Sequence, residues 1–307
     1  MKHIRKIAAA GAALLLLCAC GKNNGDLSPA DEPSAPPAVT QTQEPAAAGS
    51  PEATPETQAP QETEAPAEAT AEPTPEPTPE PTPEPTPVPA DSYAQIDTSS
   101  SAVLRGTTDM GQEYIDSITF LGDSTTYGMK YYAVLTDGKE TRQVWTPTSG
   151  TLTLSYQGFA AIWYPDEDSE ITIREAVEKK KPERMIITLG VNGVSFMDKD
   201  YFISEYTDLV TDIMELSPDT KVILQSIFPV ASNYEYLSSI NNEIISEANT
   251  WVLSVAEATG AKYLNTSTVL MGDDGWLISG YQNGDGMHLN AEGFGAVLDY
   301  IRTHGYE

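Results

Sequence analysis

Residues 21–90 cannot form a hydrophobic core, and this confines the folded part of the chain to the residues after position 90. The stretch consists largely of Pro, Glu, Thr and Ala, and the unit Glu-Pro-Thr-Pro repeats from residue 72 to residue 87. Proline lacks a backbone N–H, and aliphatic and aromatic side chains are nearly absent. We therefore expect a disordered linker with polyproline II character, either a spacer or a ligand for a partner domain. Residues 91–307 are long enough for one domain with one core.

The first 20 residues have the pattern of a secretory signal. Basic residues at positions 2, 5 and 6 precede an apolar run from residue 7 to residue 17, which is too short to span a bilayer. The end of the run, Leu17-Cys-Ala-Cys20, resembles a bacterial lipoprotein signal, and the resemblance implies that Cys20 is lipidated and begins the mature protein. We expect an extracytoplasmic protein anchored to the cell membrane through Cys20. Free secretion after cleavage is the alternative.

Composition narrows the chemistry that the domain can perform. The only two cysteines, Cys18 and Cys20, lie in or at the edge of the signal, so the domain has no disulfide, thiol nucleophile or thiolate metal site. Of the net charge of −28, residues 91–307 carry −19 (13 Lys and Arg against 32 Asp and Glu), which makes nucleic acid and anionic lipid headgroups poor partners of the domain. A neutral substrate, such as an acylated sugar, is easier to accommodate than one rich in phosphate, although the charge can also serve solubility alone.

Strands and helices alternate along the domain. Strands are predicted at residues 118–121, 143–146, 184–189, 221–227 and 262–264, and helices at 171–181, 201–216, 239–259 and 290–304. Residues 151–156 also alternate and are predicted to form an edge hairpin. Asn290 is the expected N-cap of the last helix, with Glu292 in its first turn. This order predicts a three-layer α/β/α fold around a parallel sheet of about five strands.

A small polar turn comes after the first predicted strand. The apolar run ends at Gly122, and Asp123, Ser124 and Thr125 come directly after it. Open α/β sheets place their ligands at the carboxyl ends of their strands, and the start of a following helix favours negative charge. Ser124 is therefore the candidate nucleophile. Taken alone, these four residues are equally well explained as a turn with a helix N-cap.

A second polar turn comes after the third predicted strand. It reads Gly190-Val-Asn192-Gly193, and it lies at a carboxyl end that is expected to adjoin the loop of Ser124. An asparagine amide is an uncharged donor that can hold the oxyanion of a tetrahedral intermediate. The same residue types are also good turn formers, so a structural role is the alternative.

The histidines identify a candidate general base. Of the three, His3 lies in the signal, and His304 lies in the last turn of the last helix, where it complements the helix dipole. His288 lies in the loop before that helix, with Asp285 three residues upstream. We therefore predict that His288 is the general base and that Asp285 orients its ring.

Together, these motifs make the domain resemble the SGNH hydrolases, also called GDSL esterases, over residues 118–306. The resemblance rests on Gly-Asp-Ser after the first strand, the Gly-x-Asn asparagine and the closing Asp-x-x-His. It implies a flavodoxin-like fold, with Ser124 as nucleophile, His288 as base, Asp285 as the orienting acid, and Ser124, Asn192 and Gly150 as oxyanion-hole donors. Gly158 fits the usual spacing of the glycine donor about as well as Gly150 does. Two departures from the family pattern are Thr125 in place of leucine and Gly193 in place of aspartate.

The activity implied is serine-dependent hydrolysis of an ester through an acyl-enzyme, with no metal or other cofactor. The expected substrate is an O-acyl, mainly O-acetyl, ester of a carbohydrate or cell-envelope glycan. The protein is expected to be a monomer. Three alternatives stay open: a lipid-directed esterase, lysophospholipase or thioesterase; an O-acyltransferase; and a catalytically inactive surface-binding domain.

Aromatic residues are frequent between the first and third predicted strands. We expect most of them in the core, because large rings bury well against a sheet, and a minority near Tyr127 and Trp145 at the floor of a sugar-binding cleft. The residues concerned are Tyr127, Tyr131, Tyr132, Trp145, Phe159, Trp163 and Tyr164.

Overall fold

The computed structural model describes residues 89–306 of the chain. The expected signal with Cys20, and residues 21–88 of the expected linker, lie outside the described residues. Those that are described fall within one compact unit. None of the helices in residues 89–306 is both long enough and apolar enough to cross a membrane.

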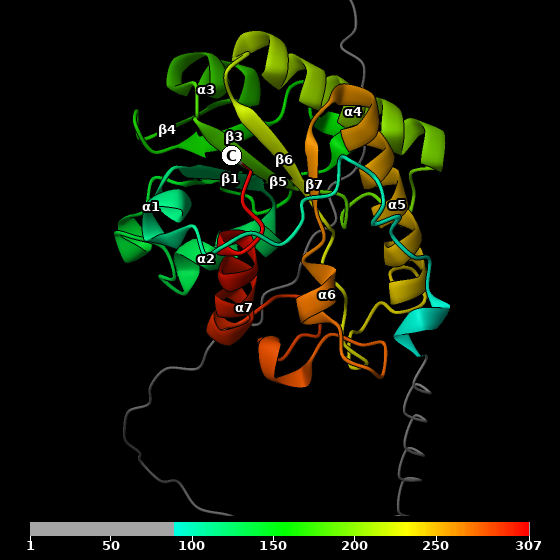
Figure 1. The fold of residues 1–307 in the computed structure, drawn as a ribbon. Coiled ribbons are helices and arrows are strands. Elements are labelled where there is room, and N and C mark those ends of the chain that lie inside the picture. The colour runs from blue at the N-terminus through cyan, green and yellow to red at the C-terminus, as the bar shows by residue number, and fades with distance from the viewer. Residues whose placement is uncertain (1–88, 307) are drawn as a thin grey trace, which may run out of the picture. The chain divides into compact units, whose positions relative to one another are not determined.

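A five-stranded parallel sheet forms the centre of the unit (Figure 1). Its strands lie in the order β2-β1-β5-β6-β7, which is the flavodoxin-like order of doubly wound folds. They are β1 (Ile118–Gly122), β2 (Val144–Trp145), β5 (Arg184–Thr188), β6 (Lys221–Gln225) and β7 (Lys262–Leu264). The predicted three-layer fold with a parallel sheet of about five strands is confirmed.

Helices cover both faces of this sheet, as Figure 1 shows. One face packs against α1 (Gly111–Asp116), α2 (Ser124–Tyr131), α6 (Ser267–Leu270) and α7 (Ala291–Arg302). The other packs against α3 (Ile173–Lys180), α4 (Lys199–Leu216) and α5 (Asn242–Thr259). Within β5, Met185 and Ile187 pack on the face covered by α3, α4 and α5, and Ile186 packs on the opposite face, because successive side chains of a strand point to opposite sides of the sheet.

Local sequence signals set the ends of several helices. The Asn290 side chain accepts a hydrogen bond from the Gly293 N–H at 3.0 Å, so the predicted N-cap of the last helix is confirmed. Thr172 and Glu175 form a reciprocal capping box at the start of α3. Gly260 ends α5 in the left-handed conformation, with φ of 81°. The described part of the chain also has four short 3-10 helices: η1 (Ala90–Ser92), η2 (Gly138–Glu140), η3 (Leu154–Tyr156) and η4 (Ser279–Tyr281).

The edge hairpin predicted at residues 151–156 is wrong. These residues form loop and η3, because Leu152 and Leu154 are both buried in the core and no partner strand lies beside them among the described residues. An antiparallel hairpin instead comes after them, made of β3 (Ala161–Tyr164) and β4 (Ser169–Thr172). It is tied to the end of β2 by a hydrogen bond from the Trp163 N–H to the Thr146 carbonyl, at 2.9 Å.

The expectation that most of the aromatic residues lie in the core is also wrong. Of the seven, only Trp145 and Tyr164 are buried, and their rings pack edge to face with centroids 5.5 Å apart. Trp145 is only 1% exposed, so it cannot form the floor of a cleft, whereas Tyr127 is 46% exposed. The structure thus retains Tyr127, but not Trp145, as a residue available to a ligand.

Candidate active site

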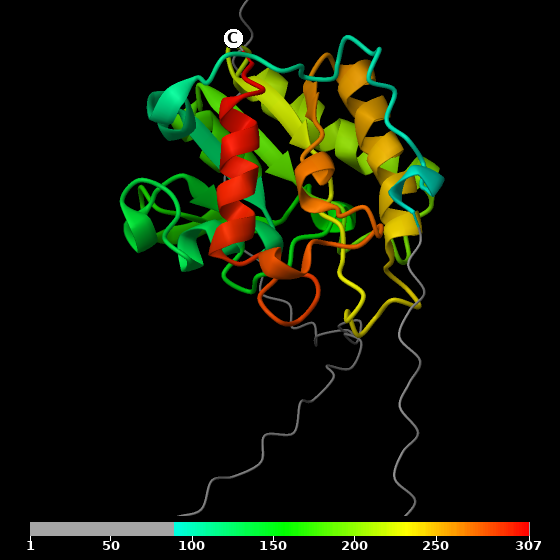
Figure 2. The same ribbon diagram turned by 60° about the horizontal axis from the view of Figure 1, so that its bottom comes forward.

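Ser124, His288 and Asp285 lie together in hydrogen-bonding contact. The Nε2 atom of His288 is 2.9 Å from Ser124 Oγ, and its Nδ1 atom is 2.7 Å from Asp285 Oδ2. Ser124 is the first residue of α2, and the loop before α7 carries the other two residues (Figure 2). This serine, imidazole and carboxylate have the geometry of an activated nucleophile whose base is held by an acid.

The loop that carries His288 is held by glycines and by backbone hydrogen bonds. Gly286 has φ of 81°, and a Cβ atom at this position would lie 2.7 Å from the backbone of Tyr234. The Gly286 carbonyl accepts from the Ala231 N–H at 2.7 Å, which ties the loop to the segment that leaves β6. At the other side of the loop, the Asn283 N–H donates to the His288 carbonyl at 2.9 Å. These contacts therefore fix the loop that places the imidazole beside Ser124.

Asp285 is anchored by the backbone as well as by the imidazole. Its Oδ1 atom accepts from the N–H groups of Met287 and His288, both at 2.8 Å. Partial burial acts to raise its pKa, but these two N–H groups and the His288 ring more than offset it, so the pKa of Asp285 lies below its ordinary value. The carboxylate is therefore ionised at neutral pH and able to orient an imidazole and stabilise its positive charge.

Asp123 is a buried carboxylate to which the sequence analysis gave no role in the site. Its Oδ1 atom accepts from both the N–H and the hydroxyl of Thr125, at 2.9 and 2.7 Å, so it caps α2 directly before Ser124. Thr125 occupies the position where the family pattern has leucine, which has no hydroxyl for the second of these bonds. The Gly-Asp-Ser motif itself was the available signal for Asp123, but nothing in the sequence indicated its second partner.

That second partner is Asn192. Its Nδ2 atom donates to Asp123 Oδ2 at 2.9 Å and to the Leu152 carbonyl at 3.2 Å. The asparagine amide is thus held beside the nucleophile by the carboxylate that caps α2. Gly193 is also explained by the local packing, because a Cβ atom there would lie 2.8 Å from the sulfur of Met197. An aspartate at this position would require the packing of Met197 to shift.

Of the two glycines considered for the oxyanion hole, Gly150 lies beside the nucleophile. A Cβ atom on Gly150 would be 3.7 Å from the Cβ of Ser124, whereas one on Gly158 would meet no atom within 4 Å. The Gly150 N–H donates to the Pro147 carbonyl at 3.0 Å, within a turn. That turn must open before this amide can reach an oxyanion. The N–H of Ser124 is in the first turn of α2, where N–H groups have no acceptor within the helix.

Burial raises the pKa of Asp123 to about 6, against the opposing effect of its bonds from Thr125. The folded protein therefore keeps a proton on this carboxyl at pH values where the unfolded chain has lost it. We expect this group to lower the free energy of unfolding by about 3 kcal/mol as pH rises from about 4 to about 6. Urea unfolding of the wild type and of Asp123→Asn across this range measures the effect, because asparagine can cap α2 but does not titrate.

The comparison isolates Asp123 because carboxylates with lowered pKa values, such as Asp285, contribute the opposite slope equally in both proteins. Asp219→Asn, at an exposed turn before β6, is the matched control and should retain the wild-type pH dependence. Equal slopes for the wild type and Asp123→Asn would contradict the prediction.

A cavity of about 430 Å³ adjoins the nucleophile. It is lined by α2, by the segment from β2 to Gly150 and by β3, and its lining includes Tyr127, Lys130 and Trp163. Tyr127 lies one helical turn after Ser124, and Gly150 packs against Ser124 directly. The hairpin that sequence analysis missed therefore contributes a wall of the cavity. The signal for it was the run Ala161-Ile-Trp-Tyr before a Pro-Asp-Glu-Asp turn.

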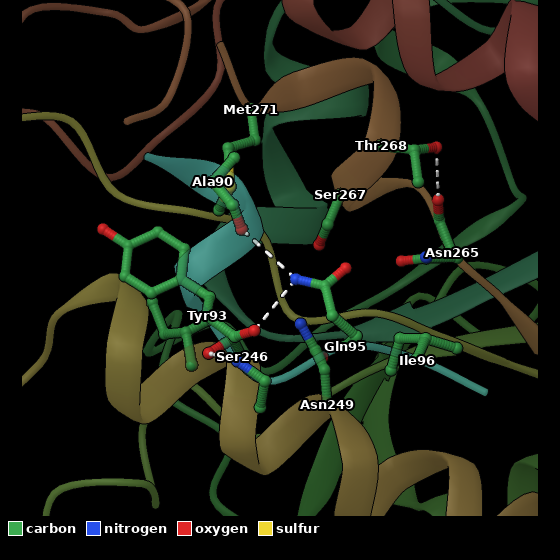
Figure 3. A pocket seen from close by; sticks show the side chains of 12 residues that line it. Ala90, Tyr93, Gln95, Ile96, Ser246, Asn249, Asn265, Ser267, Thr268 and Met271 are labelled. Atoms are coloured by element: carbon green, nitrogen blue, oxygen red, sulfur yellow. Dashed lines mark hydrogen bonds between the residues drawn. The ribbon is translucent and has the colours of Figure 1, made fainter. Parts of the chain in front are cut away.

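A separate cavity of about 270 Å³ lies between the segment after η1 and helices α5 and α6 (Figure 3). The Gln95 amide closes part of it by donating to the carbonyls of Ala90 and Tyr93. None of the residues that line it belongs to the Ser124 cluster. Within residues 89–306, no group of three or more His, Cys, Asp or Glu side chains is arranged to hold a metal ion.

Comparisons with known proteins show the family of the chain. The sequence model of the GDSL-like lipase/acylhydrolase family matches residues 120–296, which run from β1 into α7. Comparison with curated proteins found no match. Similar solved structures include a GDSL-like lipase from Bacteroides thetaiotaomicron, 20% identical, with 64% of this chain and 90% of that chain covered and a TM-score of 0.44. A carbohydrate esterase family 3 protein from Talaromyces cellulolyticus is 18% identical, with coverage of 60% and 93% and a TM-score of 0.41.

Proposed function

Because the chain belongs to the GDSL-like lipase/acylhydrolase family and is a serine ester hydrolase, we propose that it removes O-acyl groups, chiefly acetyl, from a carbohydrate or cell-envelope glycan. The observation that carries the mechanism is the pair of contacts from His288, 2.9 Å to Ser124 Oγ and 2.7 Å to Asp285 Oδ2. Ser124, His288 and Asp285 are the catalytic triad in this proposal.

The reaction proceeds in two steps. His288 takes the proton of Ser124 while the serine oxygen attacks the ester carbonyl, and it then gives that proton to the departing alcohol. Asp285 holds the imidazole in the required tautomer and stabilises its positive charge. A water molecule, activated by His288 in the same way, then releases the acid from Ser124 and restores the enzyme.

The oxyanion of each step is held by the backbone N–H of Ser124 and by the amide of Asn192, which exchanges its bond to the Leu152 carbonyl for one to the oxyanion. Gly150 is a further donor once its turn opens. We expect Asn192→Ala to lower kcat about 10²- to 10³-fold, because it removes a donor that acts in the transition state. Steady-state kinetics on a chromogenic acetate measure this loss. The control is Asn265→Ala, which removes an amide from the lining of the separate cavity. A loss below about threefold in Asn192→Ala would assign the donors to the backbone alone.

A glycan is favoured over a lipid by the kind of large apolar residue that is exposed in the described chain. The seven exposed large apolar residues of the described chain are all Tyr or Phe, and all lie on segments that leave the carboxyl ends of β1, β2, β5 and β6. Sugar rings stack on such side chains, whereas a site for long acyl chains calls for aliphatic surface. These residues are Tyr127, Tyr131, Tyr156, Phe159, Phe196, Tyr201 and Tyr236.

The enzyme acts outside the cytoplasm in this proposal, tethered through Cys20 and the Pro-rich residues 21–90. The signal-like start of the chain and the small residues before Cys20 support this location. Metabolic labelling with a fatty acid analogue tests it. Label should enter the wild type and be absent from Cys20→Ala, whereas equal labelling of both would overturn the anchor.

The activity itself is tested with the full-length protein in detergent. We expect acetate release from O-acetylated glycans, faster hydrolysis of p-nitrophenyl acetate than of p-nitrophenyl palmitate, and labelling by a fluorophosphonate probe at Ser124. A preference for the palmitate would make the protein a lipid-directed esterase. Acetyl transfer to an added sugar in place of hydrolysis would make it an acyltransferase. Absence of both labelling and turnover would leave a binding domain.

A further inference from the structure

The cavity beside Ser124 has a charge opposite to that of the protein. Lys130 is the only charged residue in its lining, and no Asp or Glu lines it, although the chain has 45 acidic residues against 17 Lys and Arg. Lys130 is half-buried in the last turn of α2. A lone ammonium group in a partly enclosed cavity is a site for an anion, because it is screened less there than on an open surface.

Lys130 is also free to bind a ligand. In residues 89–306 six other cationic side chains form ion pairs with Asp or Glu, whereas Lys130 forms none. Lys139, the cation closest to it along the chain, is exposed and lies over the Tyr131 ring at 5.5 Å. A ligand anion would therefore meet Lys130 without displacing a carboxylate.

Two aromatic side chains line the same cavity as Lys130. Tyr127 is 46% exposed, and Trp163 is half-buried in β3. Rings of this kind bind the apolar faces of a pyranose, and hydroxyls of the lining, such as that of Ser149, provide hydrogen bonds to its rim. A cavity of about 430 Å³ is within the size range of small-ligand sites.

One residue of the cavity lining, Thr148, is hydrogen-bonded to a carboxylate. Glu170 of β4 accepts from the Thr148 N–H at 2.9 Å and from the Thr148 hydroxyl. These bonds lower the pKa of Glu170, so it stays ionised, and Glu170 forms no ion pair with Lys130 among the described residues. The same bonds also join the hairpin to the loop that leads to Gly150.

We propose that this cavity binds the sugar that bears the acyl group, and that Lys130 pairs with an anionic group on that sugar, a carboxylate or a phosphate. The proposal rests on the proposed esterase function and adds the charge of the substrate to it. It replaces the expectation, drawn from the net charge of −28, that the substrate is neutral. The overall charge disfavours a dense polyanion, but the local field at the cavity favours one anion close to the ester.

The test uses three monoacetylated methyl glucosides that differ only at C6, which carries a hydroxyl, a carboxylate or a phosphate. With the full-length protein at low salt, we expect kcat/KM for one of the anionic sugars to exceed that of the neutral sugar about three- to tenfold. This ratio should fall to about one in Lys130→Met, and it should shrink as salt is added. Lys139→Met removes the same charge outside the cavity and should keep the wild-type ratio.

The identity of the favoured sugar distinguishes a sugar acid from a sugar phosphate. A wild-type ratio of one or less, or a ratio unchanged by Lys130→Met, would overturn the anion site. Failure of the proposed esterase function can be distinguished from failure of the anion site, because the wild type would then not hydrolyse p-nitrophenyl acetate. In that case the Kd values of the three sugars for Ser124→Ala still decide the question of the anion, since binding needs no turnover.

Discussion

Replacing Ser124 with alanine is expected to lower kcat about 10⁴- to 10⁶-fold while leaving the domain folded. The Ser124 hydroxyl is the atom that His288 Nε2 contacts at 2.9 Å, and no other hydroxyl is hydrogen-bonded to this ring among the described residues. The side chain is half-buried at the start of α2, and the helix cap comes from Asp123 and not from the serine. Kinetics on p-nitrophenyl acetate give the loss of turnover, and thermal unfolding gives the stability.

Fluorophosphonate labelling gives a second readout that does not depend on the choice of ester. Label should be present in the wild type and absent from Ser124→Ala, with melting temperatures within about 2 °C of each other, since the change removes one partly exposed hydroxyl. Retention of either label or turnover in Ser124→Ala would assign the nucleophile to another residue. Ser101→Ala, at an exposed position near the start of the domain, should behave as the wild type.

Asp285→Asn should lower kcat about 10³- to 10⁴-fold, the second largest effect expected. Asparagine Oδ1 can still accept from the Met287 and His288 N–H groups, so the loop keeps its shape. Its amide, however, donates to His288 Nδ1, where the carboxylate accepts. This change forces the proton onto Nε2, and the ring can no longer take a proton from Ser124. The pH profile of kcat/KM, measured with the rate, reports the loss of the base.

Asp219→Asn is the matched control for this prediction, because it removes one carboxylate charge from an exposed turn at the amino end of β6. Full activity in Asp285→Asn would mean that another group orients His288, leaving a Ser–His pair. An equal loss in Asp219→Asn would mean that overall charge, and not the contact at 2.7 Å, controls turnover.

Much of the fold could be predicted because its signals are local. The buried runs of β1, β5, β6 and β7 are apolar and end at glycine or polar residues, and the strand at residues 262–264 was predicted with the bounds it has in the structure. Asn290 could be identified as a cap from its place before a helical pattern. The hairpin predicted at residues 151–156 was wrong because the spacing of Leu152 and Leu154 also fits a loop that buries both side chains. Only packing against the sheet distinguishes such a loop from a strand.

For the candidate site, too, the residues could be predicted from the sequence and their contacts could not. Ser124, Asn192, Asp285 and His288 could be named from motifs, because each role needs a particular residue type, after a strand for the first two and before the last helix for the other two. Their contacts could not be named, since the hydrogen bond of Asn192 to Asp123 joins residues that are 69 positions apart. The partial exposure of Trp163 beside the burial of Trp145 likewise depends on which side of the hairpin faces the core.

By itself, the sequence determined the order of the five sheet strands and of α3, α4, α5 and α7, and the polar residue types that follow β1 and β5. Propensity, apolar period and turn chemistry act over a few neighbouring residues, and that is enough for these features. Only the tertiary structure decided that Asp123 is buried against Asn192, that the β3–β4 hairpin walls a cavity, and that Lys130 lies there without a carboxylate partner. These three features depend on segments that are far apart in the chain and meet in space, where burial and distance set how strongly each charge interacts with its surroundings.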